Sequence, residues 1–195
     1  MVETKAFISV EDYLDAEYTS RERHEYLNGE VRMMGYASEE HELIVANLVA
    51  SLHNCLEGTG CRVYPSNRML HVPECKRFYY ADVIVVCGPS EFYDYKKKMK
   101  ATLNPSVIIE ILSDSTEEYD RHAKWHCYQK IKSLKQYVLV SQSELYLESF
   151  QRINDLNEWL FTSADQAEQT IKIGDCEMLL SAIYSNVFPT EAPAE

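Results

Sequence analysis

Two acidic residues lie beside or within aliphatic stretches of the sequence, where a carboxylate is costly to bury. Asp82 precedes the apolar run 83–86, and Glu110 lies inside Val107–Leu112. An unpaired buried carboxylate costs on the order of several kcal/mol, and two such groups brought together repel each other. A divalent cation between them removes both costs, and Mg²⁺ prefers one or two carboxylates. Spacing alone leaves open a second interpretation, in which each acid ends a strand and pairs with a surface base.

A lysine follows these acids on a predicted helix. Lys124 is one helical turn after Asp120, so both side chains lie on the same face. If this helix packs on the sheet, the ammonium group can point toward the strand ends. There it would orient a metal-bound water and stabilise charge on a phosphate. The alternative is a solvated pair of the kind that this spacing commonly gives.

The remaining pattern predicts the elements that must position these residues. Ser9 and Ser115 each begin a capping pattern, Asn28-Gly29 is a hairpin turn, and leucines and isoleucines repeat at helical spacing after Glu39. The predicted elements are helices over 9–17, 39–56 and 115–133, strands over 62–72, 79–87, 107–112 and 137–140, a charged loop over 91–100, and a hairpin of 145–150 with 158–162. This order indicates an α/β or α+β domain with a central mixed sheet.

Composition bounds the class of protein. The chain has 195 residues, of which 46% are hydrophobic, and a net charge of −12. These values predict a single globular domain over 1–188, made of an N-terminal helix and hairpin (1–38), a core (39–140) and a C-terminal hairpin and cap (141–188), followed by an acidic tail (189–195). No apolar run approaches a membrane span, and the first residues lack a signal core. We therefore expect a cytoplasmic protein without a membrane segment.

The six cysteines form no metal-binding pattern. No pair has the spacing Cys-x-x-Cys, and zinc-finger spacing with histidines is absent from the sequence. We expect reduced, mostly buried thiols, as in other cytosolic proteins. A disulfide between Cys55 and Cys61 is an alternative that spacing permits.

The motifs, in this order, resemble those of the PD-(D/E)XK nuclease superfamily. Within it, the chain is similar to a bacterial family described as putative restriction endonucleases, over nearly its whole length. The matching segments are HEYLNGE (24–30), CRVYPS (61–66), YADVIVVC (80–87), LNPSVIIEILS (103–113), STEEYDRHAK (115–124) and SLKQY (133–137).

The resemblance implies a restriction-endonuclease-like core in the order helix, three strands, helix, strand, with flanking β-hairpins. It also implies metal-dependent hydrolysis of a nucleic-acid phosphodiester. Asp82 and Glu110 match the motif acids and would hold Mg²⁺ or Mn²⁺. The sequence departs from the motif in two places, because Ala81 replaces the motif proline and Leu112 the motif lysine. Lys124, on the following helix, matches the position to which the family's lysine has moved, so the expected catalytic set is Asp82, Glu110 and Lys124.

Two further residues match family positions. Glu30 follows the hairpin turn and His41 begins the long helix, and either could contact the metal site. The leading hypothesis is an endodeoxyribonuclease that acts as a homodimer or higher homo-oligomer, because cutting both strands requires two sites related by two-fold symmetry. The alternatives are a catalytically weak or inactive nuclease fold that serves for binding or structure, and a metal-dependent hydrolase of RNA or small phosphoesters.

Charge is unevenly distributed along the chain. Residues 61–135 contain 13 Lys and Arg against nine Asp and Glu, a net of +4, whereas the rest contains six against 22, a net of −16. This asymmetry predicts a basic cleft for DNA around Asp82 and Glu110 on an otherwise acidic body. Its expected bases are Arg62, Arg68, Lys76, Arg77, Lys96, Lys97, Lys98, Lys100, Lys130, Lys132 and Lys135.

Overall fold

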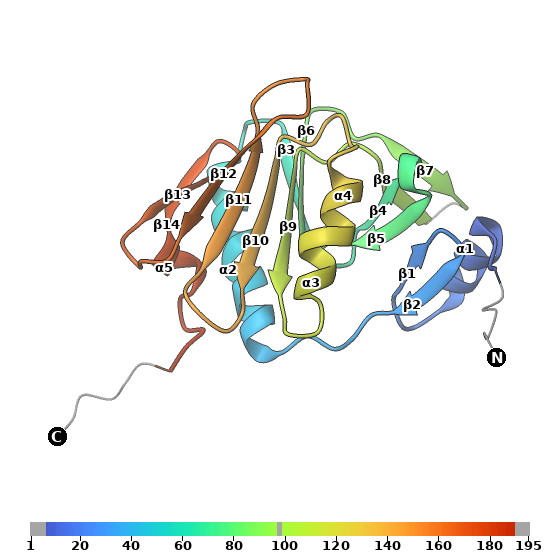
Figure 1. Ribbon diagram of the computed structural model, residues 1–195, viewed down its shortest axis with the longest axis horizontal. Coiled ribbons are helices and arrows are strands. Elements are labelled where there is room, and N and C mark those ends of the chain that lie inside the picture. Colours follow the sequence, from blue (N-terminus) through green and yellow to red (C-terminus); the bar gives the residue numbers. More distant parts are fainter. Residues whose placement is uncertain (1–6, 97–98, 190–195) are drawn as a thin grey trace.

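The computed structural model describes residues 7–96 and 99–189. Within them the chain forms two six-stranded sheets, a two-stranded ribbon and several helices (Figure 1). The helical elements are α1 (Val10–Thr19), α2 (Glu39–Cys55), a 3₁₀ turn (Pro73–Cys75), α3 (Glu117–Tyr119), a π-helical segment (Asp120–Lys124), α4 (Trp125–Tyr128) and α5 (Leu180–Ile183). No helix in the described part of the chain is long and apolar enough to cross a membrane. Of the predicted tail only Pro189 is described, and Lys97 and Lys98 also lie outside the described residues.

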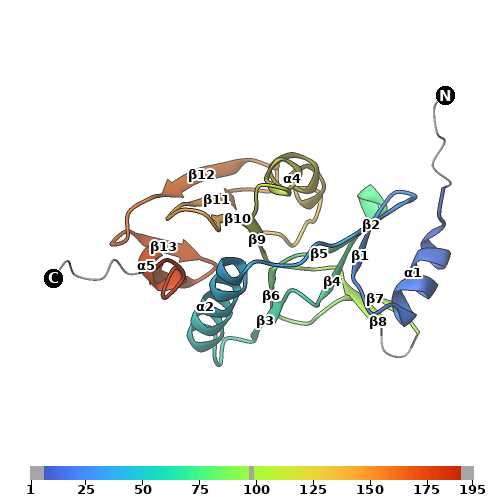
Figure 2. The same cartoon turned by 90° about the horizontal axis from the view of Figure 1, so that it is seen from below.

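The first sheet is the predicted central mixed sheet. Its strand order is β12-β11-β10-β9-β6-β3, in which β9 and β10 are parallel and the other neighbours antiparallel. Its strands are β3 (Cys61–Pro65), β6 (Val83–Cys87), β9 (Val107–Leu112), β10 (Gln136–Ser141), β11 (Leu147–Arg152) and β12 (Trp159–Ala164). Every residue of β9 and β10 is buried, because α2 covers one face of the sheet and α4 the other (Figure 2).

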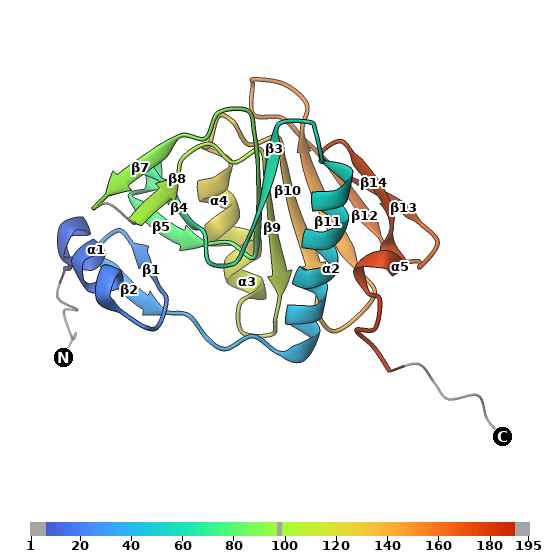
Figure 3. The ribbon, with the colours of Figure 1, turned by 180° about the vertical axis from the view of Figure 1, so that it is seen from behind.

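The second six-stranded sheet was not expected from the sequence. Its order is β2-β1-β5-β4-β8-β7, and together with α1 it forms the end of the molecule opposite β13, β14 and α5 (Figure 3). Its strands are β1 (His24–Leu27), β2 (Glu30–Met33), β4 (Met69–Val72), β5 (Arg77–Tyr80), β7 (Phe92–Tyr95) and β8 (Met99–Thr102). The hairpin β7–β8 replaces the predicted charged loop at 91–100.

Two strands predicted as continuous are each divided between the sheets. The segment 62–72 turns after Pro65, where the backbone N–H of Arg68 donates to its carbonyl, so β3 and β4 belong to different sheets. The segment 79–87 bends at Asp82, between β5 and β6. A change of sheet interrupts the strand without changing its hydrophobic pattern, which is why the pattern alone does not reveal it. The second bend places Asp82 at the junction of the two sheets.

The helix predicted over 115–133 is shorter and irregular. It ends at Tyr128, and its N-cap is Thr116, which makes no side-chain cap bond. The predicted capping box at Ser115 does not form. Hydroxyls near the strand end bond one another instead, with Ser113 Oγ 3.0 Å from Thr116 Oγ1. The π-helical segment ends at Lys124, and both Asp120 and Lys124 are buried in it.

The N-terminal helix and hairpin form as predicted. Ser9 caps α1 through the backbone N–H of Asp12, and Asn28 and Gly29 take positive φ values of 52° and 105° at the β1–β2 turn. The long helix α2 also matches its prediction, with Ser38 as N-cap and leucines and isoleucines on its buried face.

The cysteines are paired, and the prediction of reduced, mostly buried thiols is wrong for this structure. The disulfides join Cys55–Cys176, Cys61–Cys87 and Cys75–Cys127, and the alternative Cys55–Cys61 pair does not form. Only Cys127 and Cys176 are buried. Cys176 begins β14 (Cys176–Leu179), which pairs with β13 (Thr170–Ile173) in a ribbon that the sequence did not predict. Chain segments far apart in sequence form all three pairs, so spacing could not predict them.

Candidate functional site

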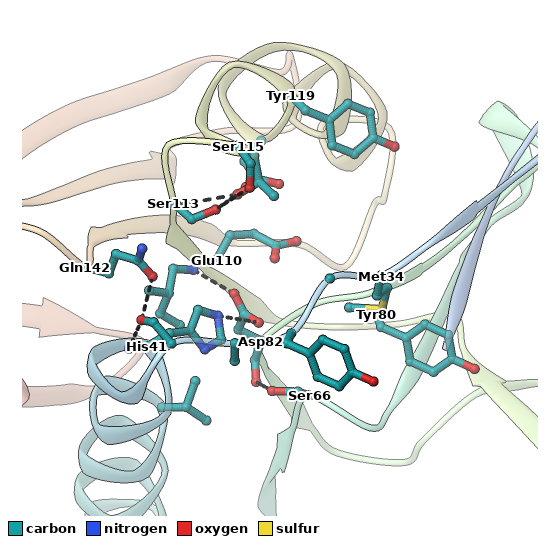
Figure 4. A pocket seen from close by; sticks show the side chains of 18 of the residues that line it. Met34, His41, Ser66, Tyr80, Asp82, Glu110, Ser113, Ser115, Tyr119 and Gln142 are labelled. Carbon is teal, nitrogen blue, oxygen red and sulfur yellow. Dashed lines mark hydrogen bonds and ion pairs between the residues drawn. The ribbon is translucent and has the colours of Figure 1, made fainter. Parts of the chain in front are cut away.

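Asp82, Glu110 and Lys124 line one pocket of about 760 Å³. They come from three separate places: the bend before β6, the middle of β9 and the end of the π-helical segment. Figure 4 shows the carboxylates of Asp82 and Glu110 pointing toward the same cavity. The structure therefore brings the three predicted catalytic residues together.

The Asp82 carboxylate is held on both of its oxygens. Oδ2 accepts a hydrogen bond of 2.8 Å from the backbone N–H of Ile111, on the neighbouring strand. Oδ1 lies 3.1 Å from Nε2 of His41, in the first turn of α2 (Figure 4). Burial lowers the pKa of His41, but the pairing with Asp82 outweighs it and raises that pKa above its ordinary value. The predicted contact of His41 with this site is present.

Glu110 is the most deeply buried of the three residues, with 2% of its surface exposed. Tyr128 donates a hydrogen bond of 2.8 Å to Oε1, and Lys124 Nζ lies 3.1 Å from the same oxygen. Burial raises the pKa of Glu110 well above its ordinary value, although Lys124 opposes that shift. Tyr128 belongs to α4, and Lys124 is the last residue of the π-helical segment before α4. Both partners of Glu110 therefore come from the helical stretch that follows β9.

Lys124 is enclosed by carboxylates and is 7% exposed. Its Nζ lies 2.9 Å from Asp120 Oδ1 and 3.6 Å from Glu25 Oε1, in addition to Glu110. The solvated alternative for this lysine is therefore wrong. Burial alone would lower the pKa of Lys124, but the three carboxylates raise it well above the ordinary value. The side chain is an ammonium ion across the physiological pH range.

The hairpin contributes Glu25 to the pocket, whereas the sequence had indicated Glu30. Glu30, the residue proposed there, is exposed on β2 and is not among the residues that line the pocket. Glu25, five positions earlier, is 5% exposed and faces Lys124. Glu25 and Tyr26 are both buried, although their side chains point to opposite faces of β1. The available sequence signal was therefore only the position of an acid inside the predicted hairpin strand.

The residues present fit a divalent cation. Four acidic side chains (Glu25, Asp82, Glu110 and Asp120) lie around one ammonium ion and one imidazole, so this buried site holds more acids than bases. Two of their oxygens, Glu25 Oε1 and Asp120 Oδ1, are buried without a hydrogen bond and meet Lys124 only as ion pairs. Within residues 7–96 and 99–189, no group of three or more His, Cys, Asp or Glu is arranged to hold a metal ion, so a cation here would have at most two protein ligands of these types. Two carboxylates completed by waters or phosphate oxygens suit Mg²⁺.

The lining of the pocket is acidic. Of its charged residues, Glu25, Glu42, Asp82, Glu110, Asp114 and Asp120 are acids, against Arg32, Lys124 and His41. None of the described bases that were expected to form a cleft lines this pocket. Arg68 stacks over Tyr64 and Phe92, and Lys100 pairs with Asp94. The predicted basic lining is therefore not observed at this pocket.

The raised carboxyl pKa values predict a pH-dependent effect of Mg²⁺ on stability. Burial raises the pKa of Glu110 and of Glu25, so the folded chain holds protons that the unfolded chain has released. Without metal, stability should therefore fall as pH rises above the ordinary carboxyl range. Mg²⁺ at about 100 times its Kd adds about 2.7 kcal/mol, or roughly 5–10 °C in Tm.

We expect this rise in Tm to be larger at pH 8 than at pH 6 at a fixed Mg²⁺ concentration, because protons compete for Glu110. Differential scanning calorimetry measures the effect, and Glu110→Gln is the control that should abolish it. An equal rise at both pH values would contradict this interpretation.

The chain is similar in sequence and in fold to known proteins. The chain is 30% and 29% identical to the uncharacterized proteins slr1290 and sll1609 of Synechocystis sp. (strain ATCC 27184 / PCC 6803 / Kazusa), over 83% of this chain and 83% and 90% of theirs. Its fold is similar to the crystal structure of "a putative nuclease belonging to DUF820" from Anabaena variabilis ATCC 29413. The TM-score is 0.72 at 13% identity, over 93% of this chain and 99% of that one.

The family model matches the part of the chain that carries the site. The Uma2 model, described as "Putative restriction endonuclease", matches residues 10–177. That match includes β1, the bend at Asp82, β9 and the helix that carries Lys124. The chain therefore belongs to the Uma2 family of putative restriction endonucleases.

Proposed function

We propose that the protein is a Mg²⁺- or Mn²⁺-dependent endonuclease that hydrolyses DNA phosphodiester bonds. The observation that supports this best is the convergence of Asp82, Glu110 and Lys124 in one pocket, with the ammonium group 3.1 Å from the Glu110 carboxylate. Membership of a family described as "Putative restriction endonuclease", and the likeness in fold to a structure described as "a putative nuclease", support the same reaction class.

In this proposal Asp82 and Glu110 hold the cation. When bound, the cation neutralises the scissile phosphate and lowers the pKa of the attacking water. His41 and the backbone N–H of Ile111 fix the Asp82 carboxylate, and Tyr128 fixes that of Glu110. Each ligand thus has a neighbour that holds its orientation, which is the usual requirement for metal ligands.

Lys124 contributes positive charge in this mechanism. Its raised pKa keeps it protonated, so it is unsuited to accept a proton from the attacking water. A buried ammonium ion beside the scissile phosphate stabilises negative charge as that charge develops. It can also donate hydrogen bonds that orient the water or a phosphate oxygen.

The partner we propose is DNA, cut by a homodimer or higher homo-oligomer. The acidic lining repels a phosphate group electrostatically until a cation neutralises the carboxylates. DNA binding at the site should therefore depend on the divalent ion as strongly as cleavage does.

Plasmid nicking tests the proposal. Purified protein should convert supercoiled DNA to the open-circular form with Mg²⁺ or Mn²⁺, and EDTA should stop the reaction. Parallel assays with single-stranded RNA and a generic phosphodiester identify a hydrolase of another substrate class. Cleavage that persists in EDTA, or none with any substrate, would contradict the proposal.

The acidic lining and Leu112 at the motif-lysine position favour a second candidate, a nuclease fold that binds nucleic acid or serves a structural role without cutting. Isothermal titration calorimetry separates the two. The endonuclease should give Mg²⁺ or Mn²⁺ binding heat that Glu110→Ala abolishes, whereas the second candidate gives none.

A further inference from the structure

The mechanism above leaves two buried acids of the pocket, Glu25 and Asp120, without a role. Glu25 lies on β1 of the second sheet, whereas Asp82, Glu110 and Lys124 are positioned by the first. Its Oε1 is fully enclosed and makes no hydrogen bond, and its nearest charged partner is Lys124 Nζ at 3.6 Å. The buried Glu25 carboxylate therefore depends on the Lys124 ammonium for the opposite charge that offsets its burial.

The backbone at Glu25 is fixed by the preceding residue. Tyr13 of α1 donates a hydrogen bond of 2.6 Å to the carbonyl of His24. The buried Glu17 accepts from the backbone N–H of His24 at 3.2 Å and lies 2.9 Å from its Nδ1. Tyr80 of β5 donates to the same Glu17 carboxylate at 2.9 Å. These contacts fix the backbone of β1 against α1 one residue before Glu25.

Lys124 is consequently held from three directions. Asp120 belongs to its own helical turn and Glu110 to the strand beneath it, whereas Glu25 alone reaches it from the second sheet. Without Glu25 the ammonium group would keep Glu110 and Asp120 as its ion-pair partners among the described residues, both on the first-sheet side. Its four-carbon stem is flexible, so the group would then occupy several positions.

We propose that Glu25 is a positioning residue, which holds the Lys124 ammonium where it can act on the phosphate. This inference rests on the endonuclease activity proposed above. It makes the N-terminal hairpin part of the active centre, because the hairpin supplies the group that aligns the catalytic lysine.

A double-mutant cycle tests the proposal. Glu25→Gln should lower kcat about 10- to 100-fold, with the KM for plasmid DNA and the Kd for Mg²⁺ changed less than twofold. In a Lys124→Met background the same change should lower kcat less than twofold further. Glu25→Asp should recover part of this loss of kcat. Glu22 is an exposed acid just before β1, so Glu22→Gln is the matched control.

A spectroscopic measurement separates this inference from the activity itself. The side-chain ammonium signal of Lys124 in ¹H–¹⁵N spectra, assigned by its loss in Lys124→Met, should be sharp in the wild type. It should broaden in Glu25→Gln and persist in Glu22→Gln. If the wild type cuts nothing, the proposed function fails, yet this signal still reports whether Glu25 positions Lys124. An unchanged signal in Glu25→Gln, or equal losses of kcat in both backgrounds of the cycle, would overturn the proposal.

Discussion

Asp82→Ala is expected to lower the rate of metal-dependent DNA cleavage about 1,000-fold or more, the equivalent of several kcal/mol of lost cation charge at the phosphate. The substitution removes one of two proposed ligands and leaves His41 without its partner. Initial rates of plasmid nicking, measured over a range of Mg²⁺ concentrations, check the effect. Because the rate loss reflects a missing ligand, added Mg²⁺ should not restore the wild-type rate.

A second variant separates the chemistry from folding. Alanine also leaves the backbone N–H of Ile111 without its acceptor, at a cost of about 1–3 kcal/mol. Asp82→Asn keeps an amide oxygen for that N–H, so it should retain the wild-type circular dichroism spectrum and thermal transition while still failing to cut. Glu57→Ala, an exposed acid beyond α2, is the matched control. Wild-type cleavage by Asp82→Asn would show that the site has been assigned wrongly.

Lys124→Met is expected to lower kcat about 100-fold or more and also to destabilise the fold. The rate falls because a fixed positive charge no longer faces the phosphate. Stability falls by about 3–5 kcal/mol, because removing one partner of a buried ion pair leaves the others uncompensated. Three carboxylates meet this ammonium ion, and the oxygens Glu25 Oε1 and Asp120 Oδ1 have no hydrogen bond besides.

The loss of stability should itself depend on pH. Carboxylates that have lost their cation can be neutralised by protons, so Lys124→Met should be less destabilised at pH 5 than at pH 8. Urea denaturation at the two values measures this, with the exposed Lys130→Met as control. Equal destabilisation at both pH values would mean that lost packing, rather than uncompensated charge, causes the effect.

Local patterns predicted those features whose causes are local. The Asn28-Gly29 turn, the Ser9 cap and the apolar stripe of α2 each depend on residues a few positions apart, and all three form. The fully aliphatic Val107–Leu112 predicted a strand buried on both faces, and helices do cover both faces. The ordered motifs predicted the family and its nuclease-like fold.

Features that depend on the path of the chain were not predictable in this way. The division of 62–72 and of 79–87 between two sheets leaves the hydrophobic pattern unchanged, so continuous strands were predicted. Disulfide partners such as Cys55 and Cys176 are 121 positions apart. The charge count along 61–135 predicted a basic cleft, but the side chains that line the pocket come from outside that segment as well, and most charged ones are acids.

The sequence by itself determined which residues were candidates for chemistry, because Asp82 and Glu110 are carboxylates beside or within aliphatic strands and Lys124 follows at helical spacing. Only the tertiary structure decided which groups surround that lysine. Glu25 lies 99 positions before Lys124, and neither residue's local pattern refers to the other. Burial and charge act through space, so the ion pair exists only once the second sheet has packed against the first.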